Sequence, residues 1–128
     1  MPEKKLVSSR LKENIDYLQS LFQNDITVKI RQFANIGDSD IRLCVFFVDG
    51  LTSEEFICPI MRSRDLKNDT DLFVTIRDRV LIGCNIMSTD DMSELLTSFL
   101  RGVAILLVDG HPQGIIISAK NWTIRTVG

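Results

Sequence analysis

Residues 103–125 read VAILLVDGHPQGIIISAKNWTIR, and this stretch decides how the C-terminal part of the chain folds. Two apolar runs, 103–108 and 114–118, flank the turn-forming pair Asp109-Gly110. Such a pattern predicts two strands joined by a tight turn at positions that need positive φ. Trp122 and Arg125 follow the second run, so the stretch also carries two candidate functional residues.

The length and composition indicate one globular domain covering 1–128. The chain has 128 residues, of which 45% are hydrophobic and 25% charged, as is usual for folded domains. Fifteen basic and seventeen acidic residues are interspersed, so no broad basic face for nucleic acid is expected. No apolar run approaches the roughly 20 residues of a membrane-spanning helix, and we expect the chain as given to be soluble.

The first elements are predicted from hydrophobic periodicity. Apolar residues at helical spacing indicate an amphipathic helix over 9–22. Apolar and polar residues alternate over 26–33, which is typical of a strand near a sheet edge. The run 41–48 is apolar on both faces, so this strand should lie centrally.

The middle of the chain is predicted to be helical and interrupted. A capping box at Thr52 opens a helix that should run through Arg62, with a kink or early break at Pro59. Residues 63–70 are expected to form a polar linker and mobile loop. Residues 71–81 fit either a helix or a strand, and the apolar spacing favours the helix.

The order of the later elements predicts the architecture. A short strand over 82–87 precedes a helix that a capping box opens at Ser88 and Gly102 ends. Two strand-helix-strand steps then join 41–48, 82–87 and 103–108, which implies parallel pairing with right-handed crossovers. We therefore predict an α/β fold: a single mixed sheet of about five strands with helices packed against it.

The sequence offers little for catalysis. His111 is the only histidine, so a catalytic triad with an imidazole could form only at its exposed turn. Asp109, two residues away, could form an acid–base pair with it. Cys58 could pair with His111 in a hydrolase, but its apolar neighbours suggest burial, as do those of Cys44 and Cys84. The spacing of these residues fits no metal site, and no phosphate-binding loop occurs. We expect no catalytic residue, metal or cofactor.

Two Asp-Gly pairs, Asp49-Gly50 and Asp109-Gly110, each end an apolar strand. Open α/β sheets often bind ligands beyond the carboxyl ends of their strands, so a small-molecule crevice near these pairs is one interpretation. The other is simple turn formation, for which Asp-Gly is a common choice.

Trp122 and Arg125 also allow two interpretations. A Trp beyond the last strand commonly closes one end of a core, and a nearby Arg commonly forms a surface ion pair. Alternatively both form a junction with another domain or subunit, since Trp and Arg are favoured interface anchors.

The chain resembles the cytosolic N-terminal region of the A subunit of GerA-type spore germinant receptors. The resemblance depends on two ordered blocks that span most of the chain. They are a Phe-Val-Asp-Gly-Leu segment at 47–51 leading to a helix with Pro59, and then Gly102, an apolar strand, Asp109-Gly110, a second apolar strand and Trp122-x-x-Arg125.

The resemblance implies a non-enzymatic part in nutrient sensing during spore germination. It implies a membrane complex of an A subunit, a permease-like B subunit and a lipoprotein C subunit, with this domain on the cytosolic side of the spore inner membrane. Members of the family continue into further soluble sequence and then transmembrane helices. The present chain would be the first subdomain, with Trp122 and Arg125 facing the next, and it could also self-associate.

Overall fold

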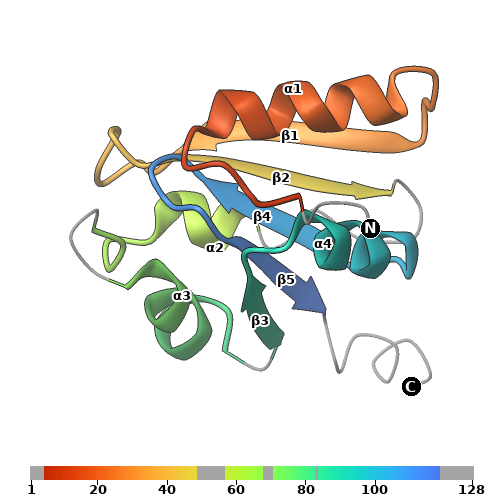
Figure 1. Cartoon of the computed structure of the whole chain (residues 1–128). Helices are drawn as coiled ribbons and strands as arrows, with labels where there is room; N and C mark the ends of the chain where they lie inside the picture. Colours follow the sequence, from red (N-terminus) through yellow and green to blue (C-terminus); the bar gives the residue numbers. More distant parts are fainter. Residues whose placement is uncertain (1–4, 49–56, 68–70, 83, 119–128) are drawn as a thin grey trace.

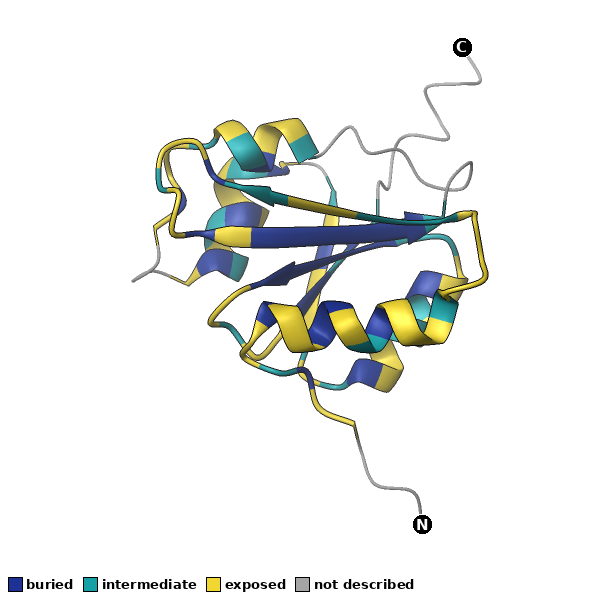
Figure 2. Ribbon diagram, turned by 90° about the horizontal axis from the view of Figure 1, so that it is seen from above, coloured by how far each residue is buried: buried dark blue, intermediate teal, exposed yellow. Residues whose placement is uncertain are grey.

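The computed structural model describes residues 5–48, 57–67, 71–82 and 84–118. Within them one five-stranded sheet, in the order β1-β2-β4-β5-β3, carries helices on both sides (Figures 1 and 2). The elements in chain order are α1 (Leu11–Phe22), β1 (Val28–Ala34), β2 (Arg42–Val48), α2 (Ile57–Arg62), α3 (Leu72–Thr75), the π-helix η1 (Ile76–Val80), β3 (Asn85–Thr89), α4 (Met92–Leu100), β4 (Ala104–Val108) and β5 (Gly114–Ser118). The predicted single sheet with helices packed against it is confirmed.

The predicted parallel pairing is wrong, because all four strand pairs are antiparallel. Strands β3 and β4 do run in the same direction, as a crossover through α4 requires, but β5 lies between them and pairs with both. This arrangement is a split β-α-β unit. The predicted crossover from β3 to β4 is confirmed, although the sequence could not show that the last strand would insert into it. The other predicted step is wrong, because β2 runs opposite to β4 and therefore opposite to β3.

Alternating side chains of the central strands build one core on each face of the sheet. In β2, Leu43 and Val45 point to the face covered by α2, α3 and η1, whereas Cys44 and Phe46 point to the face covered by α1 and α4. Strand β4 is buried along its whole length. The predicted central position of 41–48 and the edge position of the strand before it are confirmed.

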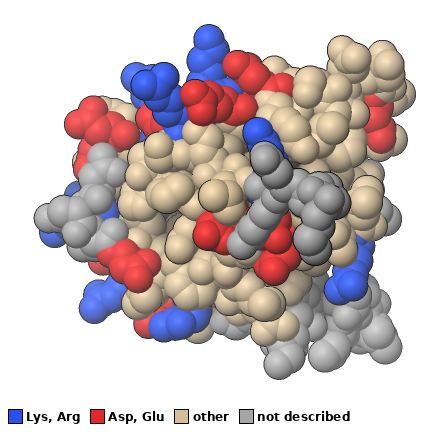
Figure 3. Space-filling view, viewed as in Figure 1, with Lys and Arg blue, Asp and Glu red and all other residues tan. Residues whose placement is uncertain are grey.

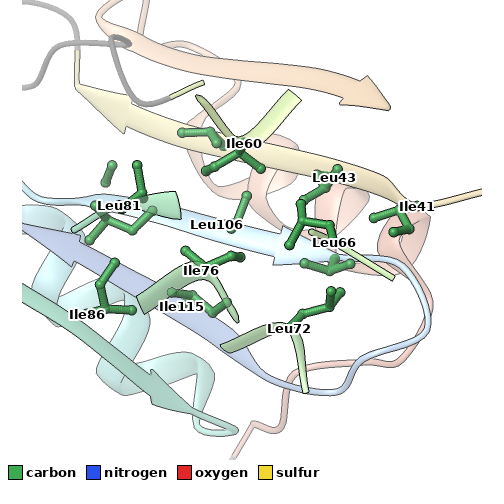
Figure 4. Packing of buried hydrophobic residues seen from close by; sticks show 14 of the residues in the cluster. Ile41, Leu43, Ile60, Leu66, Leu72, Ile76, Leu81, Ile86, Leu106 and Ile115 are labelled. Carbon is green, nitrogen blue, oxygen red and sulfur yellow. The ribbon is translucent and has the colours of Figure 1, made fainter. Parts of the chain in front are cut away.

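The core on the α2 face is aliphatic. Ile60 from α2 and Ile76 from η1 lie over Leu43 and Leu106 of the sheet (Figure 4). On the α1 face the rings of Phe46 and Phe99 pack with their centroids 4.6 Å apart. Because both cores share β2 and β4, the sheet couples the two helical layers.

The segment before β3 differs from the prediction. The helical stretch ends in the π-turn of η1, where the amide of Leu81 donates to the carbonyl of Ile76 at 2.8 Å. Ile82 follows and is 76% exposed. The strand predicted over 82–87 therefore starts later, at Asn85, because Ile82 lies in a turn and Cys84 in a bend that follow the helical segment.

The start of α4 was also placed too early. Ser88 belongs to β3, where it pairs with Ile115, and the N-cap is Asp91, whose carboxylate accepts from the amide of Ser93 at 2.9 Å. The helix ends near Gly102 as predicted, and this glycine has φ of 93°.

Helix α2 continues through Pro59 to Arg62, so the described part shows no break at the proline. Pro59 lies in the first described turn, and proline is tolerated in a first helical turn. The capping box predicted at Thr52 lies outside the described residues. The following linker was predicted to be polar and mobile, yet Leu66 within it is only 2% exposed and belongs to the core on the α2 face.

Candidate functional site

Asp109 and Gly110 form the turn that follows β4. Gly110 adopts φ of 89°, which confirms that the turn needs a residue tolerant of positive φ. The amide of Asp109 donates to the carbonyl of Arg42 at 2.9 Å, and the amide of Gly110 donates to the carbonyl of Ser9 at 2.7 Å. The turn is therefore tied both to β2 and to the segment before α1.

The carboxylate of Asp109 caps helix α1. Its Oδ1 accepts from the amide of Leu11 at 2.9 Å, across 98 residues of sequence. The local N-cap residue, Arg10, makes no side-chain capping bond. A carboxylate satisfies an orphan amide of the first turn and also interacts favourably with the positive end of the helix dipole.

Asp109 also borders a groove of about 590 Å³ between α1 and the strands β1 and β2. Charged side chains from both walls line this groove, among them Lys12, Asp16 and Arg42. Among the described features, this groove corresponds best to the ligand crevice that was considered from the sequence.

The pair Asp49-Gly50 lies outside the described residues and stays a prediction. Val48, the residue before it, ends β2, whereas Val108 pairs with Leu43 near the start of β2. The groove beside Asp109 is therefore a site at one end of the β2–β4 pair, and Val48 lies at the other end.

Two buried asparagines hold loops to helices, and the sequence pattern gave no signal for either. Asn14 is 2% exposed. Its Nδ2 donates to the carbonyl of Ser8 at 2.8 Å, and its Oδ1 accepts from the amide of Ser8 at 2.9 Å. The amide side chain thus grips the backbone of Ser8 from both sides.

The second buried asparagine, Asn35, is 1% exposed and closes the C-terminal end of α2. Its Nδ2 donates to the carbonyls of Ile60, Met61 and Ser63, at 2.9, 3.2 and 2.7 Å. Its Oδ1 accepts from the amide of Asp38 at 2.9 Å. These bonds satisfy helix-end carbonyls that would otherwise lack partners.

The three thiols were all predicted to be buried, but Cys58 and Cys84 are not fully buried. Cys44 is fully buried, and burial raises its pKa to about 12. Burial also raises the pKa of Cys84, which is partly exposed. Cys58 was predicted to be buried but is exposed, because α2 turns Ile60 to the core and leaves Cys58 on the outer side.

His111 lines a small cavity of about 30 Å³ with Asp71 and Gln113 among the described residues, and Cys58 is not part of its lining. The described ranges contain no group of three or more His, Cys, Asp or Glu side chains that could hold a metal ion. None of the described helices is long and apolar enough to cross a membrane. On the face shown in Figure 3, acidic and basic side chains alternate, without a continuous patch of one sign among the described residues.

These features define a class: a small α/β domain in which the polar residues at strand ends and turns fix helices to the sheet. The sequence model described as Bacillus/Clostridium GerA spore germination protein matches residues 16–128. The chain therefore belongs to the GerA family.

Relatives and a solved structure agree with this assignment. The chain is 28% identical over 126 residues to the membrane protein YfkQ of Bacillus subtilis, covering 94% of this chain and 24% of YfkQ. It is 26% identical to spore germination protein B1 and 24% identical to spore germination protein KA of the same species, covering 94% and 95% of this chain and 26% and 23% of those proteins. The chain thus spans about a quarter of the length of these relatives.

The fold is similar to that of the N-terminal domain of the A subunit of the Bacillus megaterium spore germinant receptor GerK3. The TM-score is 0.78 with 19% sequence identity, and the match covers 91% of this chain and 49% of that one. Family membership supports a role related to spore germination. Trp122 and Arg125 lie outside the described residues and stay predicted interface residues.

Proposed function

We propose that this chain is a non-enzymatic interaction and signal-transmission domain of a nutrient-sensing germinant receptor. In this proposal it lies on the cytosolic side of the spore inner membrane as the first subdomain of an A subunit. Its partners are the rest of that subunit, a permease-like B subunit and a lipoprotein C subunit. The family match over residues 16–128 supports this placement.

The non-enzymatic part of the proposal is supported by the state of the candidate catalytic groups. Asp109, the carboxylate nearest to the lone histidine in sequence, is engaged in capping α1. Cys44 is buried, with a pKa too high for a thiolate at neutral pH. Asp109 is thus used in the fold and Cys44 is held in an unreactive state, while the exposed Cys58 does not line the cavity that contains His111.

The proposal can be tested in spores that carry the full-length receptor. Trp122→Ala combined with Arg125→Ala should lower co-purification of the B subunit with the A subunit, and it should slow germination after nutrient addition. The proposal expects the isolated chain with the same changes to keep its melting temperature within about 2 °C, because both side chains are assigned to contacts with partners and not to the core of this chain.

The matched control is Arg79→Ala, because Arg79 is exposed on η1. Full assembly and normal germination of the double variant would contradict the assigned interface. Turnover of a compound by the isolated chain, lost on replacement of His111 or Cys58, would contradict the non-enzymatic assignment.

A second function, binding of a small polar molecule, is favoured by the groove beside Asp109. The groove holds both signs of charge and has a volume within the usual range of ligand sites, roughly 300–1,000 Å³. A ligand present at 100 times its Kd should stabilise the chain by about 2.7 kcal/mol in a thermal-shift screen. Arg42→Ala should remove that shift, whereas a screen of nutrients and nucleotides without any shift would rule this function out.

A further inference from the structure

A second cavity, of about 870 Å³, lies between the β1–β2 turn and the segment that follows α2. The turn contributes Ile36, Gly37 and Asp38 to its lining, and the segment after α2 contributes Arg62, Arg64, Leu66 and Lys67. None of these residues borders the groove beside Asp109. The cavity is therefore a separate feature of the molecule.

The two walls of this cavity are tied together. Asn35 joins them through its bonds to the carbonyls of Ile60, Met61 and Ser63. The amide of Ile36 donates to the carbonyl of Met61 at 2.8 Å. A preformed shape lowers the ordering cost when a partner binds.

Gly37 places the turn against the opposite wall of the cavity. A Cβ at this position would lie 3.2 Å from Oδ1 of Asn35 and 3.7 Å from Cα of Arg64. The turn therefore reaches the backbone of the opposite wall, which adds to the fixed shape of the cavity.

The charge of the lining differs from that of the whole chain. Three cations and one carboxylate border the cavity, whereas the chain has a net charge of −2. Arg62 and Arg64 are exposed, and neither forms an ion pair with a carboxylate of the described ranges. With three cations against one carboxylate, Asp38, the formal charge of the lining is positive.

The lining also contains apolar surface. Leu66 is 2% exposed and forms part of the core below the cavity, while Ile36 stands 67% exposed beside it. An exposed isoleucine next to two unpaired arginines favours a partner with both carboxylates and an apolar side chain, since Arg pairs well with carboxylates.

We propose that this cavity binds a short acidic peptide segment of a partner protein, with one bulky apolar side chain placed against Ile36. A peptide fits better than a small molecule, because Leu66 is the only buried residue of the described lining and small-molecule sites usually enclose most of their ligand. The inference rests on the proposed function as an interaction domain and names one of its surfaces.

Fluorescence anisotropy with this 128-residue chain and a labelled Glu-Leu-Glu-Glu-Leu-Glu peptide tests the proposal, since the described part already contains both cores. The Arg62→Glu/Arg64→Glu variant should weaken binding at least about tenfold, because two attractive charges become repulsive. Ile36→Ser should weaken binding about threefold or more through loss of apolar contact. Binding should also fall as salt rises from roughly 50 to 300 mM.

The matched control is Arg79→Glu/Arg101→Glu, which makes the same change of charge at two exposed sites outside the cavity. Its affinity for the peptide should stay within about twofold of the unmodified chain. Equal weakening by both double variants, equal binding of a Lys-Leu-Lys-Lys-Leu-Lys peptide, or full displacement by equimolar inorganic phosphate would each overturn the proposal.

The peptide measurement needs no receptor, so its failure is distinct from failure of the proposed function. If the chain does not bind the acidic peptide but the receptor still needs Trp122 and Arg125 for assembly, only the proposed peptide site in the cavity is refuted. Melting curves of every variant show that a loss of binding does not come from unfolding.

Discussion

Asp109 joins parts of the chain that are 98 residues apart, so its replacement gives a direct test of its role. Asp109→Ala should destabilise the fold by about 1–2 kcal/mol, because the first amide of α1 loses its cap and the helix loses a favourable charge. Urea denaturation followed by circular dichroism measures this change as a lower midpoint with an unchanged slope.

The control for this prediction is Asp40→Ala, an exposed carboxylate with no side-chain hydrogen bond among the described residues. It should shift the free energy of unfolding by less than about 0.5 kcal/mol. Equal effects of the two changes would mean that the loss of charge matters and the cap does not.

Burial of Cys44 predicts how stability changes at high pH. The folded pKa is about 12, above the ordinary value of 9.0, so the folded state holds this proton more tightly than the unfolded state. The stabilisation is complete below pH 9 and declines as pH rises toward 12. Between pH 7.5 and 10, the unmodified chain should lose about 1–2 kcal/mol more than Cys44→Ala, since one pKa unit corresponds to about 1.4 kcal/mol.

Denaturation in the presence of a reductant, at both pH values, measures this difference. Cys58→Ala, which removes an exposed thiol, is the control variant. Parallel pH profiles for the unmodified chain and Cys44→Ala would show that burial does not perturb this thiol.

At the residue scale, the sequence indicated which residues form turns better than it indicated which contacts a residue makes in the fold. Asp109 was correctly assigned to a turn, but a cap on a helix 98 residues away leaves no local pattern. Cys58 was assigned to the core from its apolar neighbours, whereas exposure on a short helix depends on which side meets the sheet. Asn35 lies between the predicted strands 26–33 and 41–48, and its burial follows only from the approach of α2.

At the scale of elements, Asn35 fixes the β1–β2 turn to α2, and a near-isosteric change tests this joint. Asn35→Asp replaces a donor with a carboxylate that faces three carbonyl oxygens. The variant should lose about 3 kcal/mol at pH 7, because an acceptor without donors is buried. Part of the loss should return below roughly pH 5, where the carboxyl is protonated and can donate.

Asn24→Asp serves as the control, since Asn24 is exposed. Denaturation midpoints at pH 7 and pH 4.5 compare the two variants. A loss for Asn35→Asp that is no larger than that of the control would show that the joint contributes nothing to stability.

Gly114 starts β5 beneath α4, and the space available to it is small. A Cβ there would lie 2.7 Å from Cδ2 and 3.1 Å from Cγ of Leu95, a side chain that is fully buried. Gly114→Ala should therefore destabilise the fold by about 1–3 kcal/mol through overpacking. Adding Leu95→Ala should cost less in this background than in the unmodified chain, because the clash is relieved.

A double-mutant cycle from urea midpoints measures this coupling. Ser118→Ala, at the other end of β5, gives the effect of a change in the same strand away from Leu95. Strict additivity of the Gly114 and Leu95 changes would contradict the close contact.

The order of strands and helices was predictable because the hydrophobic pattern of each element lies within its own residues, as in the apolar runs 41–48 and 103–108. Pairing was less predictable, because it depends on which strands meet in space. The last strand, β5, inserts between β3 and β4, and nothing within 114–118 specifies that position. The helix chosen for 71–81 is confirmed by α3 and η1, whereas the turn that delays the start of β3 to Asn85 was not predicted.

At the scale of the whole molecule, residues 5–10, the segment before α1, lie across one end of the fold and form a strap. Val7 is 4% exposed, and its amide donates to the carbonyl of Asp90 at 2.9 Å. The amide of Met92 donates to the carbonyl of Lys5 at 2.8 Å. With the bonds from Asn14 to Ser8, the strap connects α1, α4 and the turn after β4.

The strap lies upstream of residues 16–128, which the GerA sequence model matches, yet it completes the packing of the α1 face. A chain lacking residues 1–10 should lose about 3–5 kcal/mol, from the burial of Val7, from several hydrogen bonds and from leaving Asn14 without its partners. Hydrogen exchange should show lost protection at the amides of Met92 and Gly110, and urea denaturation should show a lower midpoint.

Val7→Ala should reproduce part of the effect, whereas Leu6→Ala should change stability little, because Leu6 is 54% exposed. Unchanged exchange at both amides in the shortened chain would mean that the strap is an appendage and that the two cores hold the domain together without it.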